Sequence, residues 1–350
     1  MNVLVTGGAG FIGSHVAEFY AKKGDSVTVV DNLSRAEIFN MNPKISMHNW
    51  NYLKANYKNI NLIKGDVRHQ DVMEKLAKNV DAIFHTAAQT AVTTSLTDPR
   101  TDFEVNALGT FNMLEAARKS GNHPAIIFCS TNKVFGNNVN KVALKEGRTR
   151  YEFADPDYRN GIPEHFSTDH CEHTPYGCSK YLADVYIQDY AERGLIDAGI
   201  FRMSCIYGTR QFGVEDQGWV IWFTLATMLG KPLNIYGDGK QVRDVLFVDD
   251  LVRAYDAFIR KRNKLHFGVF NMGGGMKNTI SLLELLDLLE QETGKRSNTS
   301  FSGWRPSDQK VYISDITKAK RILGWEPEIS PKAGVKRLVE WVGSNEKLFS

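Results

Sequence analysis

The chain has 350 residues, 42% of them hydrophobic, and its 43 Lys and Arg against 40 Asp and Glu give a formal net charge of +3. This composition supports a sizeable core and excludes disordered and fibrous proteins, while a charge so near zero argues against a nucleic-acid-binding surface. No apolar run is long enough to cross a membrane, no export signal precedes the first apolar segment, and four cysteines are too few for a disulfide scaffold. We therefore expect a cytoplasmic protein with two or three domains, or one large α/β unit with an appended lobe.

In the first half of the chain, short apolar runs alternate with segments that have helical periodicity. Five runs are suited to strands buried on both faces: Val3–Thr6, Ser26–Val30, Asn61–Ile63, Ala82–Phe84 and Ala125–Cys129. Three segments between them are typical of helices: Phe11–Lys23, Asp71–Lys78 and Thr101–Ser120. This alternation predicts an α/β fold with a Rossmann-type, doubly wound parallel sheet.

Beyond about residue 200, glycine-containing turns become frequent and the strand-like segments are short, as at Leu233–Tyr236 and Val269–Asn271. Ser281 and Glu284 have the spacing of a capping box that starts a helix, and a closing helix is expected over Ala333–Gly343. These features predict a smaller mixed α+β C-terminal lobe. We expect a sheet domain over residues 1–200, rejoined by about 237–265, and an interleaved lobe over residues 201–350.

A glycine-rich turn joins the first expected strand to the first expected helix. Gly7, Gly10 and Gly13 have the spacing G-x-x-G-x-x-G. The first glycine allows a tight turn, the second lets a pyrophosphate approach the backbone, and the third permits close packing of helix on strand. Phe11 and Ile12 begin the helix, whose free N–H groups can receive the phosphate charge. The sequence therefore predicts a dinucleotide site in the sheet domain.

Asp31 ends the second expected strand, 18 residues after Gly13, where a carboxylate accepts hydrogen bonds from both hydroxyls of the adenosine ribose. It would repel a 2′-phosphate, which favours NAD over NADP, although Arg35 could accommodate such a phosphate. A plain turn role for Asp31 is the alternative. Further positions follow the third and fourth strands, on the edge of the sheet where ligands bind: Asp66, Val67, Thr86, Ala87, Ala88 and Gln89.

Tyr176 and Lys180 are four residues apart and share one face of a helix expected to begin near Pro175. A lysine ammonium and an oxidised nicotinamide ring both favour phenolate, so we expect the pKa of Tyr176 to be lowered toward neutrality. Tyr176 is then the general base. Because such a pair alone is common on surface helices, the assignment also depends on Thr131, which ends the fifth strand and supplies a hydroxyl to orient the reacting alcohol.

The order and spacing of these motifs resemble the extended short-chain dehydrogenase/reductase family over essentially the whole chain. The match continues through Phe201–Gly208, Tyr236–Gly239, Arg243-Asp244 and Arg305–Asp308. Members of this family modify nucleotide-diphosphate sugars with bound NAD(P). The resemblance implies a catalytic triad of Thr131, Tyr176 and Lys180. The resemblance also implies NAD-binding residues besides those already named. They are Asn32, Ser34, Arg35, Asn106, Ser204, Tyr176 and Lys180.

The residues after Thr131 bear on the reaction. Family dehydratases carry an acidic pair there, because elimination of water needs an acid and a base, whereas this chain has Asn132 and Lys133. A dehydratase is therefore disfavoured. Within the family, the segments around Thr131, Tyr176 and Phe201–Val220 resemble the enzymes that invert carbon 2 of a CDP-linked 3,6-dideoxyhexose through a 2-keto sugar. A UDP-hexose 4-epimerase, a reductase and a non-catalytic NAD-binding regulator remain as alternatives.

An epimerase must anchor the nucleotide while the hexose turns, which requires clamps on the diphosphate. By family position, Arg243 and Arg305 are expected to be those clamps. Weaker expectations place Gln211 and Trp219 on the nucleotide side and Asn132, Lys133, Ser204 and Cys205 on the sugar side. For Trp219 and Cys205, a role in the core is the alternative.

The segment Asn137–His170 is polar and charged, and we expect a long loop over the sugar pocket, or else a surface excursion or subunit contact. His170–His173 fits no standard zinc spacing, so no metal is expected. The helices over 101–120 and 176–193 resemble the pair that forms a four-helix dimer interface in the family, which implies a homodimer or homotetramer. No nucleic-acid or membrane partner is expected.

Overall fold

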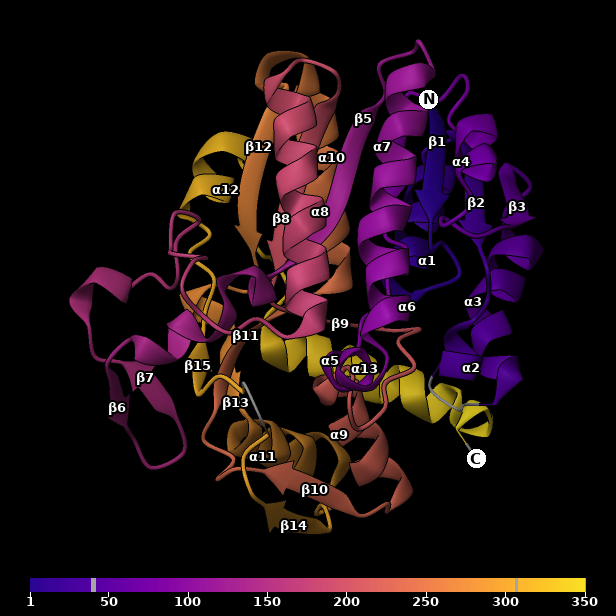
Figure 1. Ribbon diagram of the computed structural model, residues 1–350. Helices are drawn as coiled ribbons and strands as arrows, with labels where there is room; N and C mark the ends of the chain where they lie inside the picture. Colours follow the sequence, from indigo (N-terminus) through magenta and orange to yellow (C-terminus); the bar gives the residue numbers. More distant parts are fainter. Residues whose placement is uncertain (39–41, 306–307, 350) are drawn as a thin grey trace. The chain divides into compact units, whose positions relative to one another are not determined.

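The computed structural model describes residues 1–38, 42–305 and 308–349, and close packing divides the chain into two compact units (Figure 1). Unit 1 comprises Met1–Thr131, Pro175–Phe201 and Val252–Val269. Unit 2 comprises Asn132–Thr174, Arg202–Leu251 and Phe270–Ser350. The assignment of residues 1–200 to one domain stays a prediction, and residues 132–174 within that range pack in unit 2.

A seven-stranded sheet forms the centre of the α/β fold, in the order β12-β8-β5-β4-β1-β2-β3. The strands are β1 (Asn2–Thr6), β2 (Ser26–Asp31), β3 (Ile60–Lys64), β4 (Ala82–His85), β5 (Ala125–Thr131), β8 (Asp197–Met203) and β12 (Phe267–Met272). The pairs that connect β3, β2, β1, β4 and β5 are parallel, which confirms the predicted fold class. The strand expected at Val269–Asn271 is confirmed as part of β12, but it pairs in this central sheet rather than in a sheet of the lobe, because periodicity does not reveal a long-range strand partner.

Helices of unit 1 connect these strands. They are α1 (Phe11–Lys22), α2 (Arg35–Ile38), α3 (Pro43–Asn56), α4 (Gln70–Leu76), α5 (Val92–Thr97), α6 (Pro99–Phe103), α7 (Gly109–Lys119), α8 (Pro175–Glu192) and much of α10 (Val248–Leu265). The helix expected over Thr101–Ser120 is not a regular α-helix, because a π-helical turn at Glu104–Leu108 separates α6 from α7. Asn106 lies inside this turn and is buried, whereas Leu108 and Phe111 are exposed.

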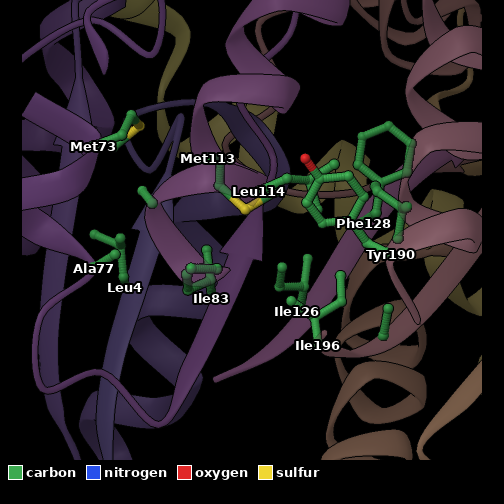
Figure 2. Packing of buried hydrophobic residues seen from close by; sticks show 14 of the residues in the cluster. Leu4, Met73, Ala77, Ile83, Met113, Leu114, Ile126, Phe128, Tyr190 and Ile196 are labelled. Carbon is green, nitrogen blue, oxygen red and sulfur yellow. The ribbon is translucent and has the colours of Figure 1, made fainter. Parts of the chain in front are cut away.

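Apolar side chains pack on both faces of the sheet. On one face, residues of α4, α7 and α8 pack against strand residues such as Ile83 and Phe128 (Figure 2). On the other face, the ring of Phe84 lies 4.9 Å from that of Tyr20 in α1 and 6.3 Å from that of Tyr255 in α10. Successive residues of a strand point to opposite faces, so Ile83 packs in one core and Phe84 in the other. Because both faces are buried, the strands are continuously apolar in the sequence.

His85, the last residue of β4, is fully buried between two hydroxyls, with Nδ1 2.8 Å from Thr6 Oγ1 and Nε2 3.0 Å from Thr110 Oγ1. Burial lowers the pKa of His85 to about 3. The unfolded chain, whose histidine has a pKa of about 6.5, therefore takes up this proton first as the pH falls. The free energy of unfolding that depends on neutral His85 is therefore fully present above about pH 6.5 and is lost progressively as the pH falls toward 3.

We expect the imidazole of His85 to lower the free energy of unfolding by about 2 kcal/mol between pH 7 and pH 5. Urea unfolding at the two pH values would measure this effect. The control is His85→Gln, which keeps a polar side chain between the threonines and should show a pH slope shallower by that amount. Equal slopes in the two proteins would contradict the assignment.

Unit 2 contains a four-stranded sheet in which β11 (Val242–Phe247) pairs with β9 (Cys205–Tyr207), β13 (Thr279–Ser281) and β15 (Val311–Tyr312), and a separate pair, β10 (Leu233–Tyr236) and β14 (Thr299–Ser302). Its helices are α9 (Trp219–Leu229), α11 (Leu282–Thr293), α12 (Thr317–Leu323) and α13 (Pro331–Ser344). The capping box of Ser281 and Glu284 is confirmed at the start of α11, and α13 covers the expected closing helix.

The segment Asn137–His170 is more ordered than the expected loop. It starts within Asn132–Lys141, where two short 3-10 helical pieces are joined by a kink at Gly136 (φ +54°), and continues into an antiparallel hairpin of β6 (Leu144–Glu146) and β7 (Tyr151–Phe153). Strands of three residues are too short to show an alternating pattern, so they could not be predicted from the sequence.

Candidate active site

The turn between β1 and α1 has no room for side chains at two of its glycines. Gly7 has a φ of +67°, and a Cβ there would lie 2.6 Å from the backbone of Ala87. A Cβ at Gly13 would lie 2.4 Å from the carbonyl oxygen of Gly7 and 2.6 Å from Thr86 Oγ1. Both glycines are therefore required for the close approach of β1, α1 and the segment after β4.

The N-terminus of α1 is suited to an anion. Gly10 is its N-cap, and among the described residues no side chain caps this end and no acidic residue occupies the first turn. The N–H groups of Phe11, Ile12 and Gly13 lie at the positive end of a 12-residue helix and can donate to a pyrophosphate.

Asp31 connects the glycine-rich turn to the end of β2. One carboxylate oxygen accepts from the N–H of Ala9 at 3.0 Å, and the other accepts from the N–H of Leu33 at 2.8 Å. Burial raises the pKa of Asp31, while these two hydrogen bonds oppose the rise. Asp31 therefore makes a local turn and also contacts the glycine-rich turn, while its role at the adenosine ribose stays a prediction.

A cavity of about 470 Å³ lies beyond Asp31 in unit 1, and its lining includes Asn32, Ser34 and Asp66. Asn32 Nδ2 donates to Asp66 at 2.9 Å, and Arg68 makes a bidentate pair with the same carboxylate at 2.7 and 3.0 Å. Although burial acts against it, the Arg68 guanidinium holds the pKa of Asp66 at about 2. Arg35, also in this region, has its pKa lowered to about 10 by burial.

The segment after β4 is held by hydrogen bonds to neighbouring elements. Thr86 Oγ1 donates to the carbonyl oxygen of Thr6 at 2.7 Å. Gln89 and Asn106 are joined twice, because the Gln89 N–H donates to Asn106 Oδ1 at 2.9 Å and Asn106 Nδ2 donates to the Gln89 carbonyl at 3.0 Å. Asn106 therefore fixes this segment, which also contains Ala87 and Ala88. Val67 is buried in the core below α7.

Thr131, Tyr176 and Lys180 all lie in unit 1, at the end of β5 and in the first turns of α8. The Thr131 hydroxyl hydrogen-bonds the Tyr176 phenol. In the protein alone, burial outweighs this hydrogen bond and raises the pKa of Tyr176 to about 12, which differs from the expected lowering. A further positive charge is required before the phenolate is populated near neutral pH.

Lys180 is buried, and its ammonium lies 4.2 Å from the centroid of the Phe128 ring. Burial lowers the pKa of Lys180 to about 8, while Cys129, Asp102 and Asp184 act in the opposite direction. Both carboxylates are themselves hydrogen-bonded. Asp102 accepts from Ser179 Oγ at 2.5 Å, and Asp184 accepts from Ser130 Oγ at 2.6 Å.

Three of the predicted substrate residues, Cys205, Trp219 and Arg243, lie together in unit 2. Cys205 pairs with Val245 in the register of β9 and β11, so its side chain is on the same face of the sheet as Arg243, two residues from Val245. Trp219 Nε1 donates to Cys205 Sγ at 3.2 Å, and Arg243 Nη2 donates to Asp308 at 2.8 Å.

Three further predicted residues also belong to unit 2. Arg305 stacks on the ring of Tyr236, with its guanidinium carbon 3.9 Å from the centroid, and forms an ion pair with Asp216 at 3.1 Å. Gln211 is buried and donates to the carbonyl of Ile206 at 3.3 Å. Ser204, expected at the cofactor, donates to the backbone carbonyl of Asp244 at 3.1 Å. Pro306 and Ser307 of the family motif lie outside the described residues.

Comparison with known proteins assigns the family. The pattern of the NAD dependent epimerase/dehydratase family matches residues 3–273. The chain belongs to this family. CDP-paratose 2-epimerase of Salmonella typhi is 39% identical over 351 residues, which cover 98% of this chain and 100% of the relative. The resemblance to the extended short-chain dehydrogenase/reductase family is thus confirmed.

Solved structures of epimerases share the fold. UDP-glucose 4-epimerase of Thermotoga maritima, solved with UDP-glucose, is 31% identical with a TM-score of 0.78 and covers 99% of this chain and 100% of its own. UDP-glucose 4-epimerase of Thermus thermophilus, solved with NAD, is 26% identical with a TM-score of 0.74 and covers 97% and 98%. The protein is an enzyme of the epimerase/dehydratase family, and NAD is its cofactor.

The glycine-rich turn and the start of α1 fit this cofactor, since a Cβ at Gly7 or Gly13 would fill the space where the turn closes. No helix among the described residues is long and apolar enough to cross a bilayer. In the same ranges, no three His, Cys, Asp or Glu side chains are grouped so that they could hold a metal ion.

Sequence reasoning missed several charged groups of this epimerase-family site. Arg68, Asp102 and Asp184 were not singled out, although Asp184 follows Lys180 by one helical turn and Arg68 follows Asp66 by two residues. That spacing was a usable signal for both. Asp102 gave none, since its partners are Ser179 and Asn106, and the contact with Ser179 depends on how α6 packs against α8.

Proposed function

We propose that the protein is a CDP-sugar 2-epimerase that interconverts CDP-paratose and CDP-tyvelose. The observation that carries this proposal is the 39% identity to CDP-paratose 2-epimerase of Salmonella typhi, which extends over practically the whole of both chains. The run Asn132-Lys133 after Thr131 supports it, because elimination of water would need carboxyl groups there. We also propose that the protein is located in the cytoplasm.

In the proposed reaction, Tyr176 removes the proton from the carbon-2 hydroxyl, and Thr131, which hydrogen-bonds the phenol, orients that hydroxyl. NAD, held by the glycine-rich turn and the start of α1, would supply a reversible hydride acceptor for carbon 2, so that the hydride can come back on the opposite face, and it would add a positive charge while oxidised. Lys180, one helical turn after Tyr176, adds a second positive charge that favours the phenolate. Hydride and proton are both returned, so the sugar is neither oxidised nor reduced overall.

On the substrate side, we propose that Arg243 and Arg305 hold the diphosphate while the 2-keto sugar turns. Each guanidinium is positioned by a carboxylate, Arg243 by Asp308 and Arg305 by Asp216. A planar guanidinium presents several donors at once, so it can contact a diphosphate while it keeps such a partner. Trp219 donates a hydrogen bond to Cys205, whose side chain lies on the same face of the sheet as Arg243.

A direct test is to incubate the purified protein, without added cofactor, with CDP-paratose, CDP-tyvelose or UDP-glucose, and to follow the sugar protons by NMR. We expect inversion at carbon 2 of both CDP sugars and no change in UDP-glucose. Inversion at carbon 4 of UDP-glucose would establish the 4-epimerase alternative instead. Bound NAD with no turnover of any sugar would indicate a non-catalytic module.

We also propose that the enzyme is a homodimer, which pairs through α7 and α8. Five apolar side chains are exposed on these helices or on the adjoining π turn: Leu108, Phe111, Leu182, Val185 and Tyr186. The rings of Phe111 and Tyr186 meet edge to face, with 5.8 Å between their centroids. An apolar patch of this kind on two neighbouring helices is typical of a protein interface.

We expect Phe111→Glu to convert the dimer into a monomer, because two carboxylates would be buried in the symmetric interface. Sedimentation velocity would measure the change in mass. Phe301→Glu is the control, since Phe301 is an equally apolar, exposed ring in unit 2. A monomeric wild type, or a Phe111→Glu variant that stays dimeric, would refute the proposed interface.

A further inference from the structure

Asp184 is a fully buried carboxylate on α8, the helix that carries Tyr176 and Lys180. Both of its oxygens accept a hydrogen bond, one from Ser130 Oγ at 2.6 Å and the other from Gln188 Nε2 at 2.7 Å. A carboxyl group that accepts at both oxygens has the bonding pattern of the ionised form. Because a buried charge is costly unless an opposite charge lies near it, the position of a neighbouring cation decides what Asp184 does.

The geometry of two elements of unit 1 places Lys180 beside Asp184. On α8 the two residues are four apart, so their side chains share a face of the helix, with about 5–6 Å between the Cβ atoms. The ammonium of Lys180 lies 4.2 Å from the centroid of Phe128, and the carboxylate is bonded to Ser130. Phe128 and Ser130 are two residues apart in β5 and therefore lie on one face of the strand. The carboxylate and the ammonium are thus neighbours in the layer between α8 and β5.

Other ionisable groups face Lys180 from the elements packed around it. Burial lowers the pKa of Lys180 to about 8, and Cys129, Asp102 and Asp184 act against this fall. Cys129, in β5, is a neutral thiol near neutral pH, because burial raises its pKa to about 11. His85, in β4, is neutral as well, since burial and then the charge of Lys180 lower its pKa to about 3. Two carboxylates, Asp102 and Asp184, therefore favour the ammonium.

The two carboxylates differ in what else they act on. Burial raises the pKa of Tyr176, and Asp102, on α6, adds to that rise, so its charge opposes the phenolate while it favours the ammonium. Asp184 is instead connected through Ser130 to the last turn of chain in β5, one residue before Thr131. One buried carboxylate thus contacts the strand end that carries the catalytic hydroxyl and lies beside the catalytic ammonium.

We propose that Asp184 is a positioning residue of the reaction, which pairs with the Lys180 ammonium and holds, through Ser130, the end of β5 that carries Thr131. The inference rests on the proposed function and its triad. When Lys180 loses its proton, the phenolate of Tyr176 loses a favourable charge, and removal of the proton from the sugar hydroxyl slows. Asp184 therefore sets the upper limit of the pH range in which the enzyme turns over.

The first test is the pH dependence of turnover in Asp184→Asn, measured on the NAD-loaded protein with CDP-paratose. The amide keeps the size of the side chain and an acceptor for Ser130, but removes the charge. We expect the pH at which turnover falls on the alkaline side to move down by about one unit, as for the loss of one neighbouring charge. Asp184→Glu restores the charge and should return this pH toward the wild-type value.

A second readout needs no sugar. The pKa of Lys180 in the folded protein, about 8, lies below that of lysine in an unfolded chain, about 10.4. Between these values the unfolded chain binds more protons, so the free energy of unfolding rises with pH. Without the charge of Asp184, this rise should begin about one pH unit lower. Urea unfolding of the variant and the wild type between about pH 6 and pH 10 gives the difference between the two curves.

Asp189→Asn is the matched control, because it removes an exposed carboxylate from the same helix, where it forms an ion pair with Arg193. Both readouts should keep their wild-type values in this protein. If Asp184→Asn does not fold, Ser130→Ala decides the question. Losing this donor leaves more of the carboxylate charge to the ammonium, so an alkaline fall at higher pH supports the inference, and one that is unmoved or lower overturns it.

The inference requires both shifts, so a value that does not move in either readout of folded Asp184→Asn overturns it and leaves the proposed 2-epimerase function intact. Failure of the wild-type protein to invert carbon 2 of either CDP sugar would instead reject the proposed function. The unfolding curves would then still report whether Asp184 and Lys180 are paired. The two failures are therefore distinguishable.

Discussion

Tyr176→Phe is expected to reduce turnover by about 10³-fold, the range in which a positioned general base contributes to catalysis. Only the phenolic hydroxyl is lost, and the ring still fills its place at the start of α8. Because the glycine-rich turn and Asp31 are untouched, the variant should purify with the wild-type amount of NAD. Sugar NMR measures the turnover, and the absorbance of cofactor released on denaturation measures the NAD content.

Tyr186→Phe is the matched control for this experiment. It removes a phenolic hydroxyl from the same helix, at an exposed position where the ring is kept. Its turnover should remain within about twofold of the wild type, because the ring that packs in the proposed dimer interface is kept and no group of the candidate site is changed. Normal turnover in Tyr176→Phe would remove the residue from its role, and loss of NAD together with turnover would show that it acts through cofactor binding.

The second large effect is expected at Gly13. In Gly13→Ala the added methyl would lie 2.4 Å from the Gly7 carbonyl oxygen and 2.7 Å from the Cα of Gly8, so the backbone must shift. Overpacking of this kind costs about 1–3 kcal/mol, and the displaced turn should also lose the cofactor. Since a ligand stabilises the folded state that binds it, the two losses add. Thermal unfolding and NAD content would measure them.

Gly343→Ala offers a control with the opposite sign. Gly343 is also a helical glycine, in α13, but its added methyl would meet Met228 Cε at an ordinary contact distance of 3.6 Å. Alanine favours a helix over glycine by up to about 1 kcal/mol, so this variant should be slightly more stable than the wild type. If Gly13→Ala kept its NAD and its stability, the assigned role of the glycine-rich turn would be wrong.

The order of elements in the first half could be read from the sequence because strands buried on both faces are continuously apolar. The sequence failed at α3, which is polar over most of its length and buries only Ser46, Asn49 and Leu53. The signals that marked its start were an N-cap and a first-turn proline. Asn42 accepts a hydrogen bond from the N–H of Lys44, and Pro43 begins the helix.

The candidate site was predictable where its chemistry follows local spacing. Tyr176 and Lys180 share a helix face by their separation alone, and the glycine-rich turn is contiguous. The pKa shifts of Tyr176 and Lys180 could not be predicted from local spacing. The rise in the pKa of Tyr176 comes from burial, and Asp102 acts on Lys180 from a different helix, so both depend on tertiary packing.

The π-helical turn at Glu104–Leu108 has a consequence for how this enzyme can vary. Each residue of an α-helix advances the chain by about 100°, so a one-residue deletion that regularised the turn would swing everything beyond it by that angle. Asn106 could then no longer face Gln89 while Phe111 faces Tyr186. The extra residue of the π turn sets the angle between the two side chains, so that Asn106 can point inward while Phe111 points outward. Insertions and deletions are therefore expected to be tolerated in the surface hairpin of β6 and β7 and to be excluded from this single turn.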